Sequence, residues 1–512
     1  MKDQVVVIDG KSLTIDAVVN VARHHHKIQV ADEALTKVDK ARKLVDDFVD
    51  EKRVVYGITT GFGKFSDVVI SKEETTDLQT NLIISHACGV GTPFAEEVTR
   101  AIMLLRVNNL AKGHSGVRRL TLNTLVDMIN KGVHPIIPEK GSLGASGDLA
   151  PLAHMVLVML GLGEAIYQGE RMSGKAAMEK AGIAPIQLTS KEGLALINGT
   201  QVMTAVGTLV TYEAIQLLKL ADISTALTVE ALKGITDAYD PRLHMVRPHL
   251  GQIKTAENLL TILKDSKLTT KQGEIRVQDA YTLRCVPQIH GASKDAIQYV
   301  VDKINIEINA VTDNPIIFPD DQVAFSGGNF HGQPMALPFD FLGIALSEIA
   351  NVSERRIERL VNPQLSGLPA FLTPHGGLHS GFMIAQYAAA ALVSENKVLA
   401  HPASVDSIPS SANQEDHVSM GTIAARKARD ILFNAQNVVA IELLSAAQAI
   451  DFDDASKLGK GSKAAYDIIR REVSKIEEDR VMYVDFNKIY DIIKTNEIVE
   501  SVENAVGALS IN

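Results

Sequence analysis

Long runs of apolar residues without proline dominate the chain after about residue 108. They cover residues 200–232, 339–360, 380–399 and 421–450, and the last of them is rich in alanine. Helices of this length and apolarity must be covered on most sides by other helices. The pattern therefore predicts a mainly α fold, a large bundle of long helices that continues across subunit contacts.

The first hundred residues follow a different pattern. Apolar and polar residues alternate around an Asp-Gly pair in VVVIDGKSLTI, residues 5–15, which predicts a β-hairpin. Residues 31–52 carry apolar side chains at helical spacing after an acidic start, which predicts an amphipathic helix. We therefore expect a smaller mixed N-terminal region over residues 1–110 and the long-helix bundle over residues 111–512.

Two long uncharged segments resemble membrane spans by length alone. Residues 194–212 include Asn198, Gln201 and four threonines, which suit a helix buried among other helices better than one in lipid. Residues 360–394 are interrupted by three prolines and cannot form one continuous span. We therefore expect no membrane partner.

Charge and cysteine content narrow the class of protein further. The 512 residues carry a net charge of −10 and no long basic run, which argues against nucleic acid as a partner. The two cysteines, Cys88 and Cys285, are far apart, which disfavours a disulfide framework and a cysteine-based zinc site. A cytoplasmic protein without a metal centre is expected.

The segment GSLGASGDLAP, residues 141–151, places three glycines just before an apolar run. Side chains are mostly nucleophiles, acids and bases, so a reaction that needs a strong electrophile must borrow a cofactor or make one. Here the amide nitrogen of Gly147, which lacks a Cβ, could attack the carbonyl of the small Ala145, and loss of the Ser146 hydroxyl would leave a methylene group. Asp148 marks a helix start whose N–H groups would stabilise negative charge on the ring. From the tripeptide alone, a plain turn before a helix is the alternative.

The longer string GSLGASGDLAPLAH resembles the signature of the aromatic amino acid ammonia-lyases. The resemblance covers nearly the whole chain, through YGITTGFG, NLIISHACGVG, LALINGTQ, QDAYTLRCVPQ, TDNP, SGGNFHGQP and SANQEDHVSMG. It implies an ammonia-lyase/fumarase-like helical fold, a homotetramer with each active site shared among three subunits, and elimination of ammonia from an aromatic amino acid. It also implies that Ala145, Ser146 and Gly147 form a 4-methylidene-imidazol-5-one (MIO) group, with no external cofactor.

The resemblance assigns roles to individual positions of this chain. Tyr56, in a glycine-flanked loop, matches the base that removes a β-proton, and Arg284 matches the residue that binds the substrate carboxylate. Asn198 and Gln278 match amides around the MIO carbonyl and the substrate. Further active-site positions are matched by Tyr281, Asn314 and Phe330.

Two features favour L-histidine as the substrate, with trans-urocanate as the product. Ser85-His86 is the pair typical of family members that act on histidine, and Glu415 supplies a carboxylate that can accept the imidazole N–H. Two positions depart from that pattern: Thr59 stands where Asn is usual, and Gly332-Gln333 where Ala-Glu is frequent. A tyrosine or phenylalanine lyase or aminomutase, and a catalytically silent tetrameric scaffold, remain the alternatives. A fumarase-type lyase is disfavoured because its flexible loop motif has no counterpart here.

Overall fold

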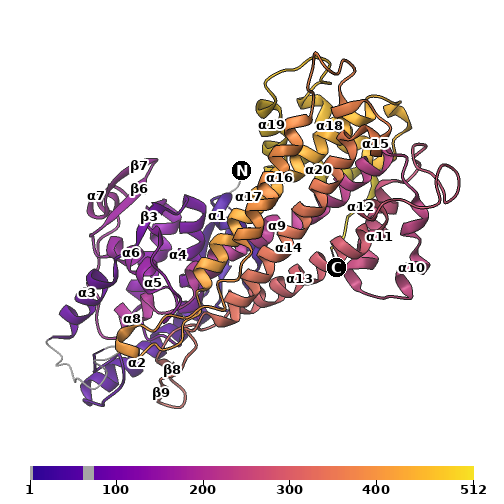
Figure 1. Cartoon of the computed structure of the whole chain (residues 1–512). Helices are drawn as coiled ribbons and strands as arrows, with labels where there is room; N and C mark the ends of the chain where they lie inside the picture. The colour runs from indigo at the N-terminus through magenta and orange to yellow at the C-terminus, as the bar shows by residue number, and fades with distance from the viewer. Residues whose placement is uncertain (1–3, 62–73, 512) are drawn as a thin grey trace. The chain divides into compact units, whose positions relative to one another are not determined.

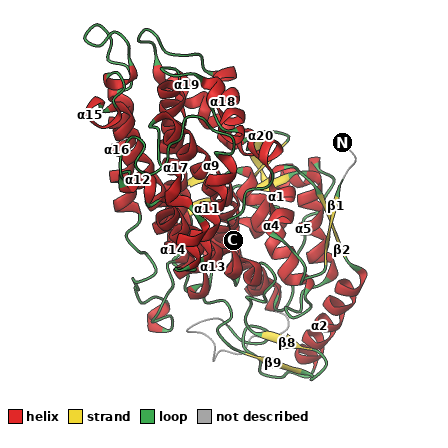
Figure 2. Cartoon of the chain, turned by 90° about the vertical axis from the view of Figure 1, so that its right-hand side faces the viewer, coloured by secondary structure: helices red, strands yellow, loops and turns green. Residues whose placement is uncertain are grey.

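The computed structural model describes residues 4–61 and 74–511 (Figure 1). Helices make up most of this part of the chain and the strands are short (Figure 2), which confirms the mainly α prediction. The glycine-rich loop that begins at Tyr56 is described as far as Gly61, and its continuation in residues 62–73 lies outside the described residues.

The chain forms two compact units. Unit one consists of Met1–Tyr212, Val301–Asp340 and Pro402–Arg426, and unit two of Glu213–Val300, Phe341–His401 and Lys427–Asn512. The boundary that we expect near residue 110 falls at the C-terminal end of α4, and it stays a prediction.

The N-terminal hairpin prediction is wrong. Strand β1 (Val5–Ile8) pairs in parallel with β2 (Lys27–Val30), and helix α1 (Ile15–Arg23) lies between them in the chain. The Asp9 side chain accepts the backbone N–H groups two and three residues later, at 2.8 and 2.9 Å. The Thr14 hydroxyl then caps the first turn of α1 at 3.1 Å. These local bonds turn the chain into a helix where the alternation alone suggested a second strand.

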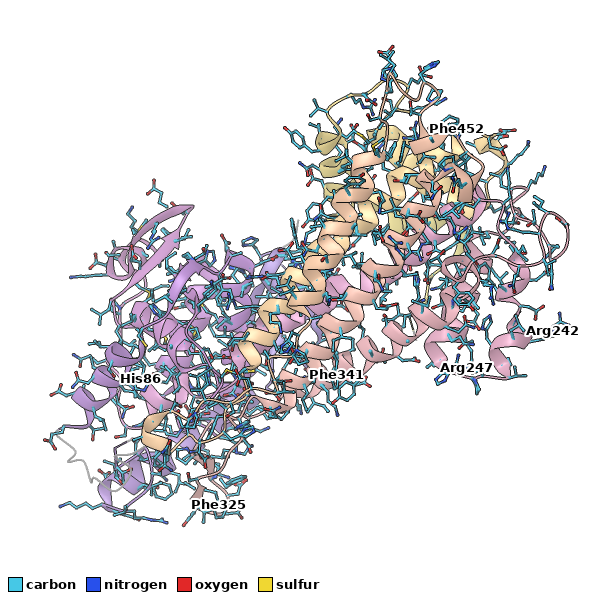
Figure 3. The ribbon with its side chains drawn as sticks, viewed as in Figure 1. His86, Arg242, Arg247, Phe325, Phe341 and Phe452 are labelled. Atoms are coloured by element: carbon cyan, nitrogen blue, oxygen red, sulfur yellow. The ribbon has the colours of Figure 1, made fainter. Side chains whose placement is uncertain are left out.

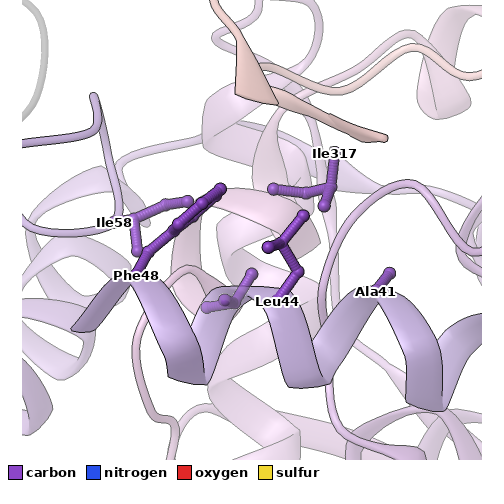
Figure 4. Close-up of a cluster of buried hydrophobic side chains, with 6 residues drawn as sticks. Ala41, Leu44, Phe48, Ile58 and Ile317 are labelled. Carbon is purple, nitrogen blue, oxygen red and sulfur yellow. The ribbon is translucent and has the colours of Figure 1, made fainter. Parts of the chain in front are cut away.

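The amphipathic helix is confirmed as α2 (Asp32–Asp50). Its apolar face packs in a buried cluster with the start of the glycine-rich loop (Figure 4); the cluster consists of Ala41, Leu44, Val45, Phe48, Ile58 and Ile317. Burial of a side chain such as Phe48 contributes roughly 1.5–3 kcal/mol to the stability of the folded state. Ile58, two residues after Tyr56, therefore anchors the loop that carries Tyr56 to α2.

The rest of unit one combines helices with short antiparallel strand pairs. The strand pairs are β3 with β5, β4 with β6, β6 with β7, and β8 with β9. The helices are α3 (Thr75–His86), α4 (Glu96–Ala111), α5 (Arg119–Lys131), α6 (Leu149–Met159), α7 (Gly174–Lys180) and α8 (Glu192–Ile197), and the strands β3 (Val90–Pro93), β4 (Val133–Pro135), β5 (Pro138–Lys140), β6 (Glu164–Tyr167), β7 (Glu170–Ser173), β8 (Ile316–Phe318) and β9 (Val323–Phe325). Helix α4 is buried from Val98 to its end, which places it at the centre of this unit.

The long apolar runs form the predicted helices, which are α9 (Gln201–Ala231), α14 (Gln333–Val361), α16 (Met383–Leu399) and α17 (Gly421–Ile450). One expectation needs correction, because the segment 194–212 is not a single helix. Helix α8 ends at Ile197, and a turn over residues 198–200 precedes α9. Among the described residues, α14 alone is long and apolar enough to cross a membrane, but 67% of its most apolar stretch is buried, as in the core helix of a globular protein.

Unit two is built from helices packed around buried charges. Its other elements are α10 (Pro241–Met245), α11 (Leu250–Ile262), α12 (Tyr281–Arg284), α13 (Val286–Glu307, which ends in unit one), α15 (Pro363–Ser366), α18 (Lys460–Glu472), α19 (Met482–Lys494) and α20 (Glu497–Val506). Arg356 and Glu442 form one fully buried ion pair, and Lys294 and Asp222 form another. Such pairs must stay intact, because removal of one partner would leave an uncompensated buried charge.

Candidate active site

The tripeptide Ala145-Ser146-Gly147 leads into the N-terminus of α6, and Asp148 is the N-cap residue, as predicted. Gly147 has a φ of +73°, and a Cβ there would lie 2.1 Å from the carbonyl oxygen of Gly199. Both the conformation and the space therefore require glycine at this position. Ser146 is half-buried, so its hydroxyl stays within reach of other groups.

Asp148 is fully buried, and its carboxylate does not cap its own helix. One oxygen accepts the N–H groups of Val202 and Met203, each at 2.9 Å, in the first turn of α9. The other accepts the hydroxyl of Ser142 at 2.8 Å and that of Thr422. Burial raises the pKa of Asp148, while these hydrogen bonds lower it. The side chain thus fastens the tripeptide to α9, a role that the sequence did not indicate because its partners are distant in the chain.

The turn before α9 brings Asn198 to the tripeptide. The N–H of Gly199 donates to the Ser146 carbonyl at 3.4 Å, and its carbonyl accepts the Asp148 N–H at 2.7 Å. Asn198 Nδ2 donates to the Asn314 carbonyl at 3.2 Å, while the buried Asn198 Oδ1 has no hydrogen-bond partner among the described residues. The structure therefore groups the predicted residues Asn198 and Asn314 beside the tripeptide.

Glu415 contacts the tripeptide directly. The Ser146 hydroxyl donates to Glu415 Oε1 at 2.9 Å, and the Ser410 hydroxyl donates to Oε2 at 2.9 Å. His86 lies at the C-terminal end of α3 (Figure 3), with its Nδ1 3.1 Å from the Ser85 hydroxyl. Burial lowers the pKa of His86, and the Glu415 carboxylate opposes that shift. His86 and Glu415, both predicted to select the substrate, are thus electrostatically coupled, and Glu415 is bonded to Ser146.

The contacts of Thr59 and Gly332 fit these two departures from the histidine-type pattern. The Thr59 hydroxyl donates to the Arg53 carbonyl at 2.6 Å and accepts the Val55 N–H at 3.0 Å, which closes the turn that contains the half-buried Tyr56. A Cβ on Gly332 would lie 2.6 Å from both the Met203 methyl group and the Ser419 hydroxyl. Glycine is therefore suited to the packing of this segment, which follows the half-buried Phe330.

The other three predicted residues belong to unit two. Gln278 and Arg284 line a cavity of about 370 Å³. Arg247, which is labelled in Figure 3, also lines it. Arg284 Nε donates to the Asp279 carbonyl at 2.9 Å, and its guanidinium carbon lies 4.6 Å from the centroid of the Tyr281 ring. These contacts hold a guanidinium group at the wall of a cavity large enough for an amino acid.

Comparison with known proteins supports one family. Residues 13–471 match the aromatic amino acid lyase family. The histidine ammonia-lyase of Alkaliphilus oremlandii is 70% identical over 501 residues, which cover 98% of this chain and 99% of that protein. The crystal structure of histidine ammonia-lyase from Trypanosoma cruzi superposes with a TM-score of 0.92 at 42% identity, covering 98% of this chain and 96% of that one. The tyrosine aminomutase from Streptomyces globisporus superposes with a TM-score of 0.95 at 40% identity, covering 99% and 100%.

Proposed function

Because the chain belongs to the aromatic amino acid lyase family, we propose that it eliminates ammonia from L-histidine to give trans-urocanate. One contact carries this proposal: the Glu415 carboxylate lies 2.9 Å from the Ser146 hydroxyl, where it can bind an imidazole ring beside the reacting group. The relatives named histidine ammonia-lyase, identical at up to 70% of positions, support the same substrate.

The residues around the tripeptide fit an MIO group. Gly147 has a positive φ and lies so close to Gly199 that no side chain would fit there. The buried Asn198 Oδ1 has no hydrogen-bond partner among the described residues. The N–H groups at the start of α6 can stabilise negative charge on the ring. The group, formed from Ala145, Ser146 and Gly147 by loss of two water molecules, supplies the electrophile that turns the substrate amine into a better leaving group.

Glu415 recognises the imidazole ring in this proposal. The carboxylate accepts a ring N–H and stabilises the protonated ring, and a positively charged imidazolium withdraws electrons and acidifies the neighbouring β-carbon. A phenyl ring has no such donor and would leave the carboxylate desolvated and unpaired, at a cost of several kcal/mol. His86, half-buried at the end of α3, orients the ring or the substrate backbone.

The remaining residues bind the other end of the substrate and move its proton. Arg284 pairs with the carboxylate through its planar guanidinium, and Tyr56 removes the β-proton. The resemblance assigns five further residues to the shared site, namely Gln278, Tyr281, Asn198, Asn314 and Phe330.

A homotetramer that shares its active sites accounts for the apolar surface of unit two. Val246 is 85% exposed, Val277 70% and Tyr281 69%, and all three lie in or beside the segments that form the Arg284 cavity. Phe341 (Figure 3), Ile384 and Tyr387 are likewise exposed. Exposed apolar patches of this kind mark protein contacts, and we assign them to other copies of the chain. The cytoplasm, without nucleic acid or membrane as partners, is the compartment that we propose.

Incubation of the purified protein with histidine, tyrosine and phenylalanine in separate reactions tests the substrate. Urocanate, coumarate and cinnamate have different ultraviolet spectra, and we expect urocanate alone to accumulate. Coumarate or cinnamate without urocanate would instead support a tyrosine or phenylalanine lyase, and a β-amino acid product would support an aminomutase. Intact-protein mass spectrometry should show a deficit of two water molecules in folded protein. No product from any of the three would support the silent scaffold.

A further inference from the structure

A buried arginine holds the turn that carries Asn198. Arg106, on α4, has no exposed surface, and in the described part of the chain its hydrogen bonds all go to neutral oxygens. One terminal nitrogen donates to the carbonyls of Ala195 and Asn198, each at 3.0 Å, and the other donates to Gln201 Oε1 at 2.5 Å. A single guanidinium group therefore binds the last turn of α8, the turn itself and the first residue of α9.

A cation suits this place in the fold. The last carbonyl groups of a helix have no partners within the helix and carry partial negative charge. Burial lowers the pKa of Arg106 to about 10, and the Asp313 and Asp148 carboxylates oppose that shift, so the group stays charged at neutral pH. Lysine could not replace it, because one ammonium group cannot present the same planar fork to three acceptors.

The Gln201 amide extends the link from this turn to the segment that carries Asn314. Because Gln201 Oε1 accepts from Arg106, its Nε2 is directed to the Thr312 hydroxyl, to which it donates at 2.8 Å. Asn198 Nδ2 donates to the Asn314 carbonyl at 3.2 Å. The two segments that supply site residues are thus joined twice, once through Arg106 and Gln201 and once directly.

The same turn contacts the tripeptide through its next residue. Gly199 donates to the Ser146 carbonyl and accepts from the Asp148 N–H. A displacement of the turn would therefore move Asn198 away from its place in the site and loosen the backbone around the ring-forming residues. We propose that Arg106 is a positioning residue, which acts through Asn198 and Gly199 on both ring formation and turnover; its role in turnover rests on the function proposed above.

A matched pair of substitutions tests this role. Arg100 lies on the same helix, is 2% exposed, and donates to the carbonyls of Val21 at 2.9 Å and Ile129 at 3.1 Å, which are not site residues. We expect Arg106→Lys to lower kcat for urocanate formation roughly ten- to a hundredfold with little change in KM, since the substrate-binding groups remain. The fraction of chains with the two-water mass deficit should fall as well. Arg100→Lys should keep the wild-type kcat and the full deficit.

Equal kcat and equal mass deficit in folded Arg106→Lys and Arg100→Lys would overturn the proposal. If Arg106→Lys does not fold, Gln201→Met removes the bonds of Gln201 to Arg106 and to Thr312 but leaves Arg106 bonded to the Ala195 and Asn198 carbonyls. It should lower kcat in protein that still folds cooperatively. A wild-type kcat in Gln201→Met would then overturn the proposal. If the wild-type protein makes no urocanate, the proposed substrate is wrong. The two-water mass deficit of Arg106→Lys, or of Gln201→Met in its place, compared with that of the wild type, still decides the effect on ring formation.

Discussion

At the scale of single residues, burial separates two carboxylates near the tripeptide. Asp148 is fully buried and accepts two backbone N–H groups and two hydroxyls, so it has no capacity left for a ligand. Glu415 is half-buried and is bonded to the hydroxyls of Ser146 and Ser410. Formation of the ring would remove the Ser146 hydroxyl and free one carboxylate oxygen for the substrate. Asp148 therefore has a structural role, and Glu415 is the carboxylate that remains available to bind a substrate.

Glu415→Gln tests this assignment. We expect kcat/KM for histidine to fall at least about a hundredfold, because the variant loses a charge-assisted hydrogen bond and polarises the imidazole less. Asp416→Asn, a neutralisation at the neighbouring exposed position, should leave kcat/KM nearly unchanged. Unaltered histidine turnover in Glu415→Gln would contradict the proposed substrate recognition.

His134 makes the stability of unit one depend on pH. Its side chain is buried next to Arg100, and burial, together with the Arg100 and His25 charges, lowers the pKa of His134 to about 4. Between pH 6.5 and 4 the unfolded chain binds a proton that the folded chain does not, so stability falls as the pH falls, by up to about 3 kcal/mol at pH 4 and below.

Substitution of His134 checks this dependence. His134→Gln should lose less unfolding free energy than the wild type between pH 7 and pH 4, as measured by urea titrations at each pH. His24→Gln, at an exposed position, should follow the wild-type curve. If the unfolding free energies of the wild type and His134→Gln fall in parallel with pH, this histidine is not responsible for the loss of stability in acid.

At the scale of elements, close backbone contacts decide which helices can cross. Helices α11 and α13 meet at Gly251 and Gly291, where a Cβ on Gly251 would lie 2.3 Å from the Gly291 carbonyl oxygen. A Cβ on Gly291 would lie 2.4 Å from the Gln252 backbone nitrogen. Because backbone atoms cannot rotate away as side chains do, this crossing requires glycine on both helices.

Gly291→Ala should therefore destabilise the protein by about 1–3 kcal/mol or more, through separation of α11 and α13. Gly343→Ala, in the interior of α14, approaches the flexible end of Ile431 at 3.1 Å and makes an ordinary contact with the Ala428 Cα at 3.9 Å, so it should change stability much less. Thermal unfolding at one scan rate compares the two variants. A midpoint for Gly291→Ala at or above that of Gly343→Ala would contradict the proposed role of the crossing.

At the scale of the whole molecule, the proposed site residues belong to both units. Tyr56, the tripeptide and Glu415 lie in unit one, whereas Gln278, Tyr281 and Arg284 lie in unit two. The exposed apolar side chains of unit two suit contacts with other copies. An assembly of several chains can therefore complete each site with residues from different subunits.

Two inactive variants should complement each other if the sites are shared in this way. Tyr56→Phe and Arg284→Ala, each inactive alone, should together form mixed tetramers of four 55.3 kDa chains with up to about a quarter of the wild-type rate. Urocanate formation after co-expression measures this recovery. A chain that carries both substitutions, mixed with either single variant, is the negative control. No recovery in mixed tetramers would place Tyr56 and Arg284 of each site on one chain.

Features that depend on neighbours in the chain could be predicted from the sequence. The apolar period of α2, the long helices α9 and α17, and the helix start at Asp148 arise from local side-chain pattern and capping, so the structure confirms them. The Ala145-Ser146-Gly147 tripeptide, which is proposed to form the ring, is likewise a local motif.

Only the tertiary structure decided how distant segments meet. Three features join residues that are far apart in the chain: the pairing of β1 with β2, the hydrogen bonds of Asp148 to α9, and the bonds of Arg106 to the Asn198 turn. The break between α8 and α9 depends on such contacts. Local pattern determines which segments become helices, because helix formation is governed by near neighbours. It does not determine which buried donor meets which acceptor, because that depends on how the segments pack.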